Sequence, residues 1–302
     1  MDRWAPPVSV LLVLGVVSFA FAPTLVRWAG DVPALTIAVW RTVTAAGVLA
    51  PGLLSTRARA QLRAVSGRTL LLMLAAGGIL GVHFLLWIES LGHTTVASAS
   101  IFVTSSPLLL AALGYLVLGE RLSAGTLVAI GVAVAGAVLI GWADAGTVTL
   151  GRGALWGNGL ALGAAVLVSL YLLIGRVVRQ TVGWWAYVFP VYGAAAVVIV
   201  ATAGIQGTPL LGYPWRVYGL CAALALGPQV LGHGAFNYAV QQVSATVVGL
   251  LALLEPVGAS ILAYGLFGER PPALSVLGMG VVLGAVGVVV WRRNRGRDET
   301  AP

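Results

Sequence analysis

Four ionisable side chains lie inside long apolar stretches of the sequence, where a charge is costly. Arg41, His83, His233 and Glu255 each stand within a run of mainly apolar residues that is long enough to cross a membrane. A charged side chain at the centre of a membrane helix costs about 2.5–3.5 kcal/mol on insertion scales. We therefore expect each of the four to have a buried partner or a function.

Glu255 is followed directly by Pro256, whose ring removes one helical N–H and clashes with the carbonyl group four residues earlier. We expect a local kink there that frees backbone carbonyl groups toward a cavity. In that cavity Glu255 can bind a cationic group or a coupling proton, or it can have a structural role in which it pairs with Arg41 or caps the kink. Arg41 can meet a carboxylate or phosphate group bidentately, or it can neutralise Glu255 or Glu89.

The two histidines occupy matched positions. His83 precedes Trp87 by four residues, and His233 precedes Asn237 by four, so each pair shares one helix face. This pattern favours a cavity in which the histidines bind substrate or carry protons. A metal site is not expected, because two histidines without a carboxylate at ligand spacing do not make one.

Further side chains can line the same path. Ser98, Phe102 and Ser105 have the i, i+4, i+7 spacing of one helix face, and Phe19 and Tyr171 lie at roughly matched positions. The candidate substrate-binding residues are Phe19, His83, Trp87, Ser98, Phe102, Ser105, Tyr171, His233, Asn237 and Glu255.

The composition of the chain indicates the class of protein and the kind of secondary structure in which these residues lie. The chain has 302 residues, of which 59% are hydrophobic and 9% are charged, with mean hydropathy +0.99. Such a composition indicates an all-α integral membrane protein. The single cysteine, Cys221, allows no intramolecular disulfide, and the chain contains no lysine for Schiff-base chemistry. The sequence contains no phosphate-binding loop and no aromatic-interleaved basic patch, so we expect no cofactor, no ATP-driven pump and no nucleic-acid partner.

The hydropathy pattern predicts ten membrane spans. They cover about 8–28, 34–54, 69–90, 94–118, 124–142, 154–175, 184–204, 216–238, 245–267 and 273–291. With the N-terminus inside, twelve arginines fall in cytoplasmic segments and four in external ones. This bias predicts that both termini are cytoplasmic, in the inner membrane of the cell. The basic tail, residues 292–302, is expected to bind anionic lipid.

The two halves of the chain resemble each other. At an offset of 149, Pro107 matches Pro256, and the Gly-Glu-Arg sequence 119–121 matches 268–270. The predicted repeats are 1–142 and 151–291, with five spans each. Because five is odd, the second repeat must be inverted in the membrane, an arrangement typical of secondary transporters. The paired turn residues are Gly119, Glu120, Arg121, Gly268, Glu269 and Arg270.

These repeats, each with a proline, an apolar stretch, Gly-Glu-Arg and a glycine-rich last helix, resemble the EamA repeats of the drug/metabolite transporter superfamily. Leu254-Glu255-Pro256 resembles the second-repeat form of the motif, and Arg41 stands where the family's second helix commonly carries an arginine. The resemblance implies a ten-helix carrier that often exports amino acids or other small metabolites. Because these positions look family-wide while substrates vary, it favours structural roles for Arg41 and Glu255. Ser106 stands where the second repeat has Glu255, so the halves differ.

Four classes of function can be compared with these sequence features. A secondary carrier that exports small organic metabolites such as amino acids or related amines, with or without proton coupling, fits best. An exchanger of sugar phosphates or nucleotide sugars would need several central cations, and only Arg41 qualifies. A membrane-embedded enzyme would need a catalytic constellation that the sequence lacks, so no enzymatic activity and no catalytic residue are expected. A purely structural protein would not need buried charges. The expected partners are a small-molecule substrate and the lipid bilayer; a homodimer is compatible but not required.

Overall fold

The computed structural model describes residues 8–94, 99, 102–103, 105–120, 122–145, 152–268, 270 and 272–298. Every regular element within these residues is helical. The candidate residues Ser98, Arg121 and Glu269 lie outside the described residues. The elements are α1 (Val8–Ala29), α2 (Ala34–Leu49), η1 (Ala50–Leu54), α3 (Thr56–Ala64), α4 (Gly67–His93), α6 (Ser106–Leu118), α7 (Ala124–Ala145), α8 (Arg152–Val178), α9 (Trp184–Gln206), α10 (Trp215–Leu224), η2 (Ala225–His233), α11 (Gly234–Ala239), α12 (Ala245–Ala252), α13 (Leu254–Phe267) and α14 (Ala273–Asp298).

Seven helical segments in the described part of the chain are long and apolar enough to cross a membrane. Three shorter apolar helices accompany them: Ser106–Leu118, Ala124–Leu139 and Ala273–Val289. The protein is therefore a multi-pass membrane protein. The seven long segments are Val8–Ala29, Ala34–Gly52, Gly67–His93, Leu155–Val178, Trp184–Gln206, Trp215–Ala239 and Ala245–Leu266.

Two elements differ from the sequence-based expectation. The short helix α3 lies between the expected spans 34–54 and 69–90, where no helix was predicted; Ser55 caps it by accepting a hydrogen bond from the N–H of Ala58. The last helix, α14, continues to Asp298, beyond the expected end of the span at 291. Residues 292–298 contain no proline, and four of the seven are arginine, a good helix former, so the helix can continue through them.

Two membrane segments are irregular next to the polar residues. Helix α12 ends at Ala252 and α13 begins at Leu254, because Pro256 clashes with the carbonyl group of the residue four positions earlier, Ala252. The break that the sequence predicts near Glu255 is thus present. In the eighth expected span, the π-helical segment η2 joins α10 to α11 and contains Pro228. Such wide turns are frequent at functional sites.

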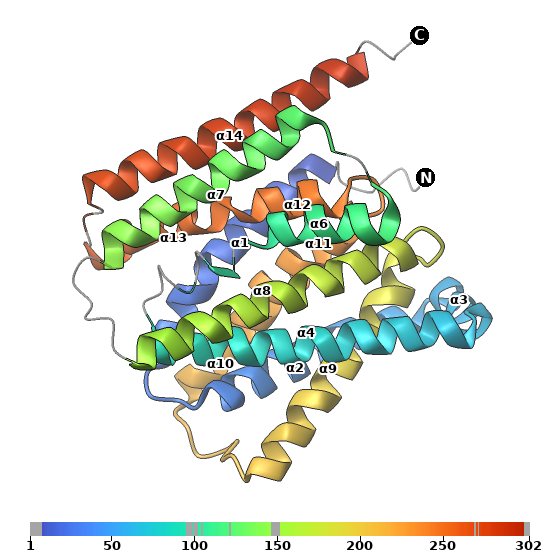
Figure 1. The fold of residues 1–302 in the computed structure, drawn as a ribbon. Helices are drawn as coiled ribbons and strands as arrows, with labels where there is room; N and C mark the ends of the chain where they lie inside the picture. The colour runs from blue at the N-terminus through green and yellow to red at the C-terminus, as the bar shows by residue number, and fades with distance from the viewer. Residues whose placement is uncertain are drawn as a thin grey trace.

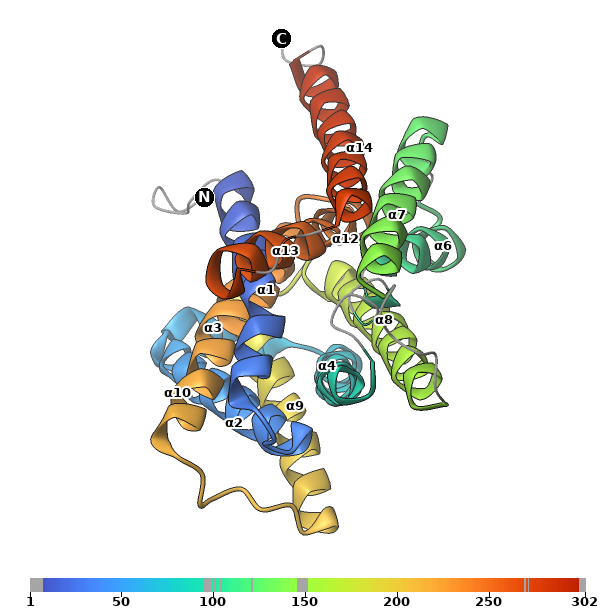
Figure 2. The ribbon, with the colours of Figure 1, turned by 90° about the vertical axis from the view of Figure 1, so that its left-hand side faces the viewer.

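The helices form two packed groups (Figures 1 and 2). In the larger group α4 packs closely against α8 and α9, and α1 packs against η2 and α13. In the smaller group α7 and α14 lie side by side, and Ala133 and Val282 are among its buried residues. Gly136 allows this contact, because a Cβ atom there would lie 2.9 Å from the carbonyl oxygen of Gly278.

Candidate functional site

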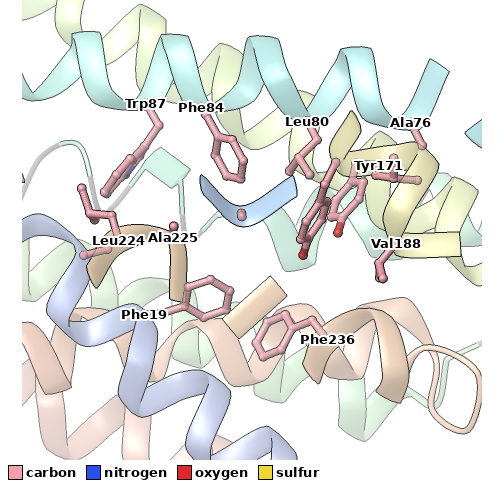
Figure 3. Packing of buried hydrophobic residues seen from close by; sticks show 14 of the residues in the cluster. Phe19, Ala76, Leu80, Phe84, Trp87, Tyr171, Val188, Leu224, Ala225 and Phe236 are labelled. Carbon is pink, nitrogen blue, oxygen red and sulfur yellow. The ribbon is translucent and has the colours of Figure 1, made fainter. Parts of the chain in front are cut away.

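A buried cavity lies in the larger group, where α1, α2, α4, η2 and α13 converge. Its volume is about 60 Å³, room for only a few water molecules. It is lined by Phe19, Ala22, Arg41, His83, Phe84, Trp87, Val103, Ser106, Val168, Leu172, Pro228, His233, Phe236, Gly249, Ala252 and Glu255. Five of the ten candidate substrate-binding residues, and Arg41, therefore meet at one place. In Figure 3, Phe84 and Trp87 project from α4 toward Phe19 and Phe236.

Arg41 is held rigidly in the wall of this cavity, and only 2% of its surface is exposed. Its Nε donates a hydrogen bond to Oε1 of Gln229 over 3.0 Å, and its Cζ lies 3.9 Å from the centre of the Phe84 ring. Both contacts stabilise a guanidinium group away from bulk water. Within the described residues, its two terminal nitrogens donate to no protein acceptor.

Glu255 lies on the cavity wall in the first turn of α13 and is 7% exposed. The N-terminal end of a helix favours a negative charge. Glu255 and Arg41 line the same cavity, but no direct ion pair joins them in the described part of the chain. The alternative pairing with Glu89 is also absent there: the Glu89 carboxylate lies 3.0 Å from Nε2 of His93.

The two histidines lie together, with ring centroids 6.0 Å apart. His83 Nδ1 is 2.8 Å from the carbonyl oxygen of Ala164. Because a carbonyl only accepts, Nδ1 carries the proton and Nε2 is left as an acceptor. His233 packs edge-on against Phe19 and Phe84, and its Nδ1 has no hydrogen-bond partner in the described structure. The matched spacing thus does place both histidines on one cavity.

Tyr171 and Asn237 lie behind His233 rather than on the cavity wall. The amide nitrogen of Asn237 donates to the Tyr171 hydroxyl and to the carbonyl oxygen of His233. The rings of Tyr171 and His233 are 5.9 Å apart. These two candidates therefore support a cavity residue and do not line the cavity themselves.

Of the expected polar face, Ser98 lies outside the described residues, and Phe102 and Ser105 are not among the residues that line the cavity. Ser105 donates to the carbonyl oxygen of Phe102 over 2.6 Å and precedes the first residue of α6. The neighbouring residues Val103 and Ser106 line the cavity.

Sequence reasoning missed several residues of the site, among them Phe84, Gln229 and Phe236. A signal existed for Gln229, because a buried glutamine beside Pro228 in an apolar run needs a partner. Phe84 and Phe236 resemble ordinary apolar membrane residues, and no signal in the sequence separates them from the rest.

One end of the helix group is tied together by arginines at the end of α8. Arg176 donates from Nε to Glu120 of the first Gly-Glu-Arg turn, and from Nη1 to the carbonyl oxygen of Val240. Arg179, which is buried, donates from Nε to the carbonyl oxygen of Asn237 over 3.0 Å. Burial lowers the pKa of Arg179 to about 10, so it stays charged at neutral pH. These bonds hold the end of α8 against the turn after α6 and against the end of α11 and the residue that follows it.

The opposite end is more open. A hollow of about 430 Å³ lies between the ends of α1, α2 and α4, and Arg27, Asp31 and Glu89 are among its lining residues. Pro23 and Ile88 line this hollow, while Ala22 and Trp87, one residue earlier, line the central cavity. Consecutive residues of α1 and α4 thus contribute to the walls of the two spaces.

The two turns of the repeat share one backbone feature. Gly119 has φ 65° and Gly268 has φ 69°, the left-handed conformation that glycine adopts at helix ends. Gly119 follows α6 and Gly268 follows α13. Arg270 is exposed, and Arg121 and Glu269 lie outside the described residues. Among the residues described, no group of three or more His, Cys, Asp or Glu side chains is placed to hold a metal ion.

The sequence model of the EamA-like transporter family matches residues 7–142 and, a second time, residues 155–291. The chain belongs to the EamA-like transporter family. The curated relatives of this EamA protein are distant transporters. It is 28% identical over 216 residues to a "Probable terminal-alkyne amino-acid exporter" of Streptantibioticus cattleyicolor, which covers 69% of this chain and 68% of the relative. It is 24% identical over 210 residues to the "Uncharacterized transporter YetK" of Bacillus subtilis, which covers 67% of this chain and 62% of the relative.

A solved crystal structure resembles this EamA protein over nearly its whole length. It covers 95% of this chain and 98% of the matched chain, with a TM-score of 0.78 and 19% sequence identity. At that identity the match establishes the fold alone. The resemblance to the family that the motifs predict is thus confirmed by the family match.

Proposed function

We propose that this protein is a secondary transporter that exports small organic metabolites, such as amino acids or related amines, by alternating access. The observation that carries the proposal is the central cavity, which brings Arg41 and Glu255, two buried groups of opposite charge, to one place among membrane helices. Buried charges in membrane helices commonly mark substrate or ion pathways. The family match and a relative described as an amino-acid exporter agree with this proposal.

We extend the proposal to the architecture: ten membrane helices in two inverted repeats of five, 1–142 and 151–291, with both termini cytoplasmic in the cell membrane. The two separate family matches, 7–142 and 155–291, support two repeats. The odd number of spans per repeat and the arginine distribution support the inversion and the orientation. In this orientation the end tied by Arg176 faces the cytoplasm and the hollow beside Arg27 faces outward.

The size of the cavity supports a transport mechanism in which the surrounding helices move. About 60 Å³ is far below the roughly 300–1,000 Å³ of ordinary ligand pockets. A metabolite can enter only if the helices around the cavity separate. Because the two ends of the helix group differ in their contacts, we propose that they open alternately, the hollow at one end and the end tied by Arg176 at the other.

An exchanger of sugar phosphates or nucleotide sugars has weaker support. Arg41 is the cationic side chain on the cavity wall of the described structure, and Glu255 lies on the same wall. A phosphate with two negative charges would meet one fixed cation and one carboxylate. We propose no enzymatic activity and no cofactor.

Transport is tested with the purified protein in liposomes. Uptake of labelled amino acids, primary amines and sugar nucleotides is measured with and without a pH gradient of either sign. We expect amino-acid flux above that of empty liposomes, and stimulation by a pH gradient would identify proton coupling. A folded sample that moves none of these solutes would contradict the proposal, and preferential flux of sugar nucleotides would favour the exchanger.

A further inference from the structure

We propose that Arg41 and Glu255 together bind the charged head group of a zwitterionic substrate: Arg41 binds its carboxylate and Glu255 binds its ammonium group. This assignment rests on the proposed transport function and names the substrate class of the same cavity. The argument uses the free atoms of the two side chains, the charges around them and the apolar wall between them.

The free part of Arg41 has the shape that recognises a carboxylate. A guanidinium group has five N–H donors, and two parallel ones match the two oxygens of a carboxylate. The Nε donor is used by Gln229, and one face is covered by Phe84. These two contacts fix the plane of the guanidinium group. The remaining four donors, on the terminal nitrogens, have no protein acceptor within the described residues.

Glu255 supplies the complementary charge. Its carboxylate lies on the wall of the same cavity as Arg41 and accepts no hydrogen bond from the described protein. A buried carboxylate without a bonded partner is unfavourable in a membrane. An ammonium group is a compact donor of three hydrogen bonds, like that of lysine. A substrate ammonium group that lies between Glu255 and the substrate carboxylate bound to Arg41 would compensate the negative charge of each carboxylate.

A zwitterion suits this pair better than a singly charged solute does. A simple amine would satisfy Glu255 and leave Arg41 without an anion, while a simple carboxylate would do the reverse. An α-amino acid carries both charged groups on one carbon atom, so one small molecule compensates the two residues at once. The charge balance of the cavity is then preserved when substrate binds.

The rest of the wall indicates the side chain of the substrate. Phe19, Phe84, Trp87 and Phe236 line the same cavity as the two charged residues. Burial of apolar surface against such rings is favourable. His233 adds an Nδ1 atom without a partner, which can bind a water molecule or a polar substrate atom. We therefore infer an α-amino acid with an apolar side chain.

The test compares three probes that differ only in the head group: L-leucine, L-leucine methyl ester, which lacks the carboxylate charge, and 4-methylpentanoate, which lacks the amino group. Each competes for uptake of labelled L-leucine into liposomes that contain the wild-type protein. We expect both analogues to compete about 10- to 100-fold less well than L-leucine, because each loses a charge-assisted hydrogen bond.

Two variants assign the two ends of the head group. Arg41→Gln should abolish the preference for leucine over its methyl ester and keep the preference over 4-methylpentanoate. Glu255→Gln should abolish the preference for leucine over 4-methylpentanoate and keep the preference over the methyl ester. Arg41→Lys keeps the positive charge but lacks the two parallel N–H donors of the guanidinium group. It should restore part of the preference for leucine over its methyl ester. Glu89→Gln, which changes a carboxylate outside the cavity wall, is the matched control and should keep both preferences.

The outcomes separate this inference from the proposed transport function. If the wild-type protein carries leucine but does not distinguish the three probes, or if the variants keep both preferences, the head-group assignment is wrong and transport stands. If only amines are carried, the assignment is likewise wrong. If a folded wild-type protein carries no solute, transport itself is contradicted. Because variants can lose stability, the binding of each probe is also measured as a shift in the thermal unfolding of the purified variant in detergent.

Discussion

Arg176 of α8 donates a hydrogen bond from Nε to Oε1 of Glu120 over 3.2 Å. The two residues come from different matched halves of the chain: Glu120 lies in the turn after α6, within the first family match, and Arg176 within the second. The pair is about a quarter exposed on each side, so water weakens its contribution to stability to about 1 kcal/mol or less. We therefore infer that the contact matters for access to the cavity from this end of the helix group and contributes little to stability.

The first prediction concerns this contact. Arg176→Gln should loosen the tied end of the helix group and raise access to the central cavity from that end. Access is measured as the alkylation rate of a cysteine introduced by Ser106→Cys, a cavity-lining position, in a Cys221→Ser background. In inverted membrane vesicles we expect a several-fold faster reaction with a membrane-impermeant maleimide.

The control for this prediction is Arg59→Gln, which removes an exposed arginine from α3. It should leave the alkylation rate unchanged. Equal rates in the wild-type and Arg176→Gln backgrounds would show that the contact with Glu120 does not limit access to the cavity.

The second prediction concerns the support of Arg41. Gln229→Leu removes the oxygen that accepts from Arg41 Nε and leaves a buried charged donor without a partner. A hydrogen bond to a charged group contributes about 1.5–3 kcal/mol, so the variant should unfold at a clearly lower temperature and bind substrate more weakly. Gln206→Leu changes an exposed glutamine at the end of α9 and should have little effect. If both variants unfold alike, Gln229 does not support Arg41.

The third prediction concerns the contact between α4 and α9. A Cβ atom at Gly77 would lie 2.2 Å from the carbonyl oxygen of Val191, a contact that only a backbone shift can relieve. Gly77→Ala should therefore destabilise the protein by about 1–3 kcal/mol. At the next residue, Gly78, a Cβ atom would make an ordinary contact at 3.8 Å with Val198.

The neighbouring substitution is a matched control with the opposite sign. Gly78→Ala should be neutral or stabilise the helix by up to about 1 kcal/mol, because alanine is the better helix former. Thermal unfolding of the two variants in detergent checks both expectations. Equal unfolding temperatures would contradict the close approach of α4 and α9.

The fourth prediction concerns the break between α12 and α13. Pro256→Ala removes the clash with the carbonyl group of Ala252 and should allow one continuous helix through Leu253. We expect a higher unfolding temperature and a several-fold lower transport rate, because Glu255 would turn with the straightened helix. Pro190→Ala, in the regular helix α9, is the control. An unchanged transport rate in Pro256→Ala would show that the break is not needed.

Much of this protein follows from its sequence alone. The long apolar runs predict membrane helices, because only a helix satisfies its own backbone hydrogen bonds in lipid. The repeated Gly-Glu-Arg sequences predict turns, and Gly119 and Gly268 do adopt the left-handed conformation that ends a helix. The proline after Glu255 predicts the break at Ala252. Each of these features is local, so a few neighbouring residues decide it.

The site itself depended on the tertiary structure. The matched spacing of His83 and His233 indicated a shared cavity. Arg41 was expected to meet a substrate anion or to neutralise Glu255 or Glu89, and no pattern in the sequence indicated that its Nε donates to Gln229. Ser105 was expected on the cavity wall, and Ser106 is there. Which atoms meet depends on how far each helix is rotated and how closely it approaches its neighbours. Close contacts such as that of Gly77 with Val191 determine the rotation and the approach of the helices. These contacts join residues that are far apart in the chain.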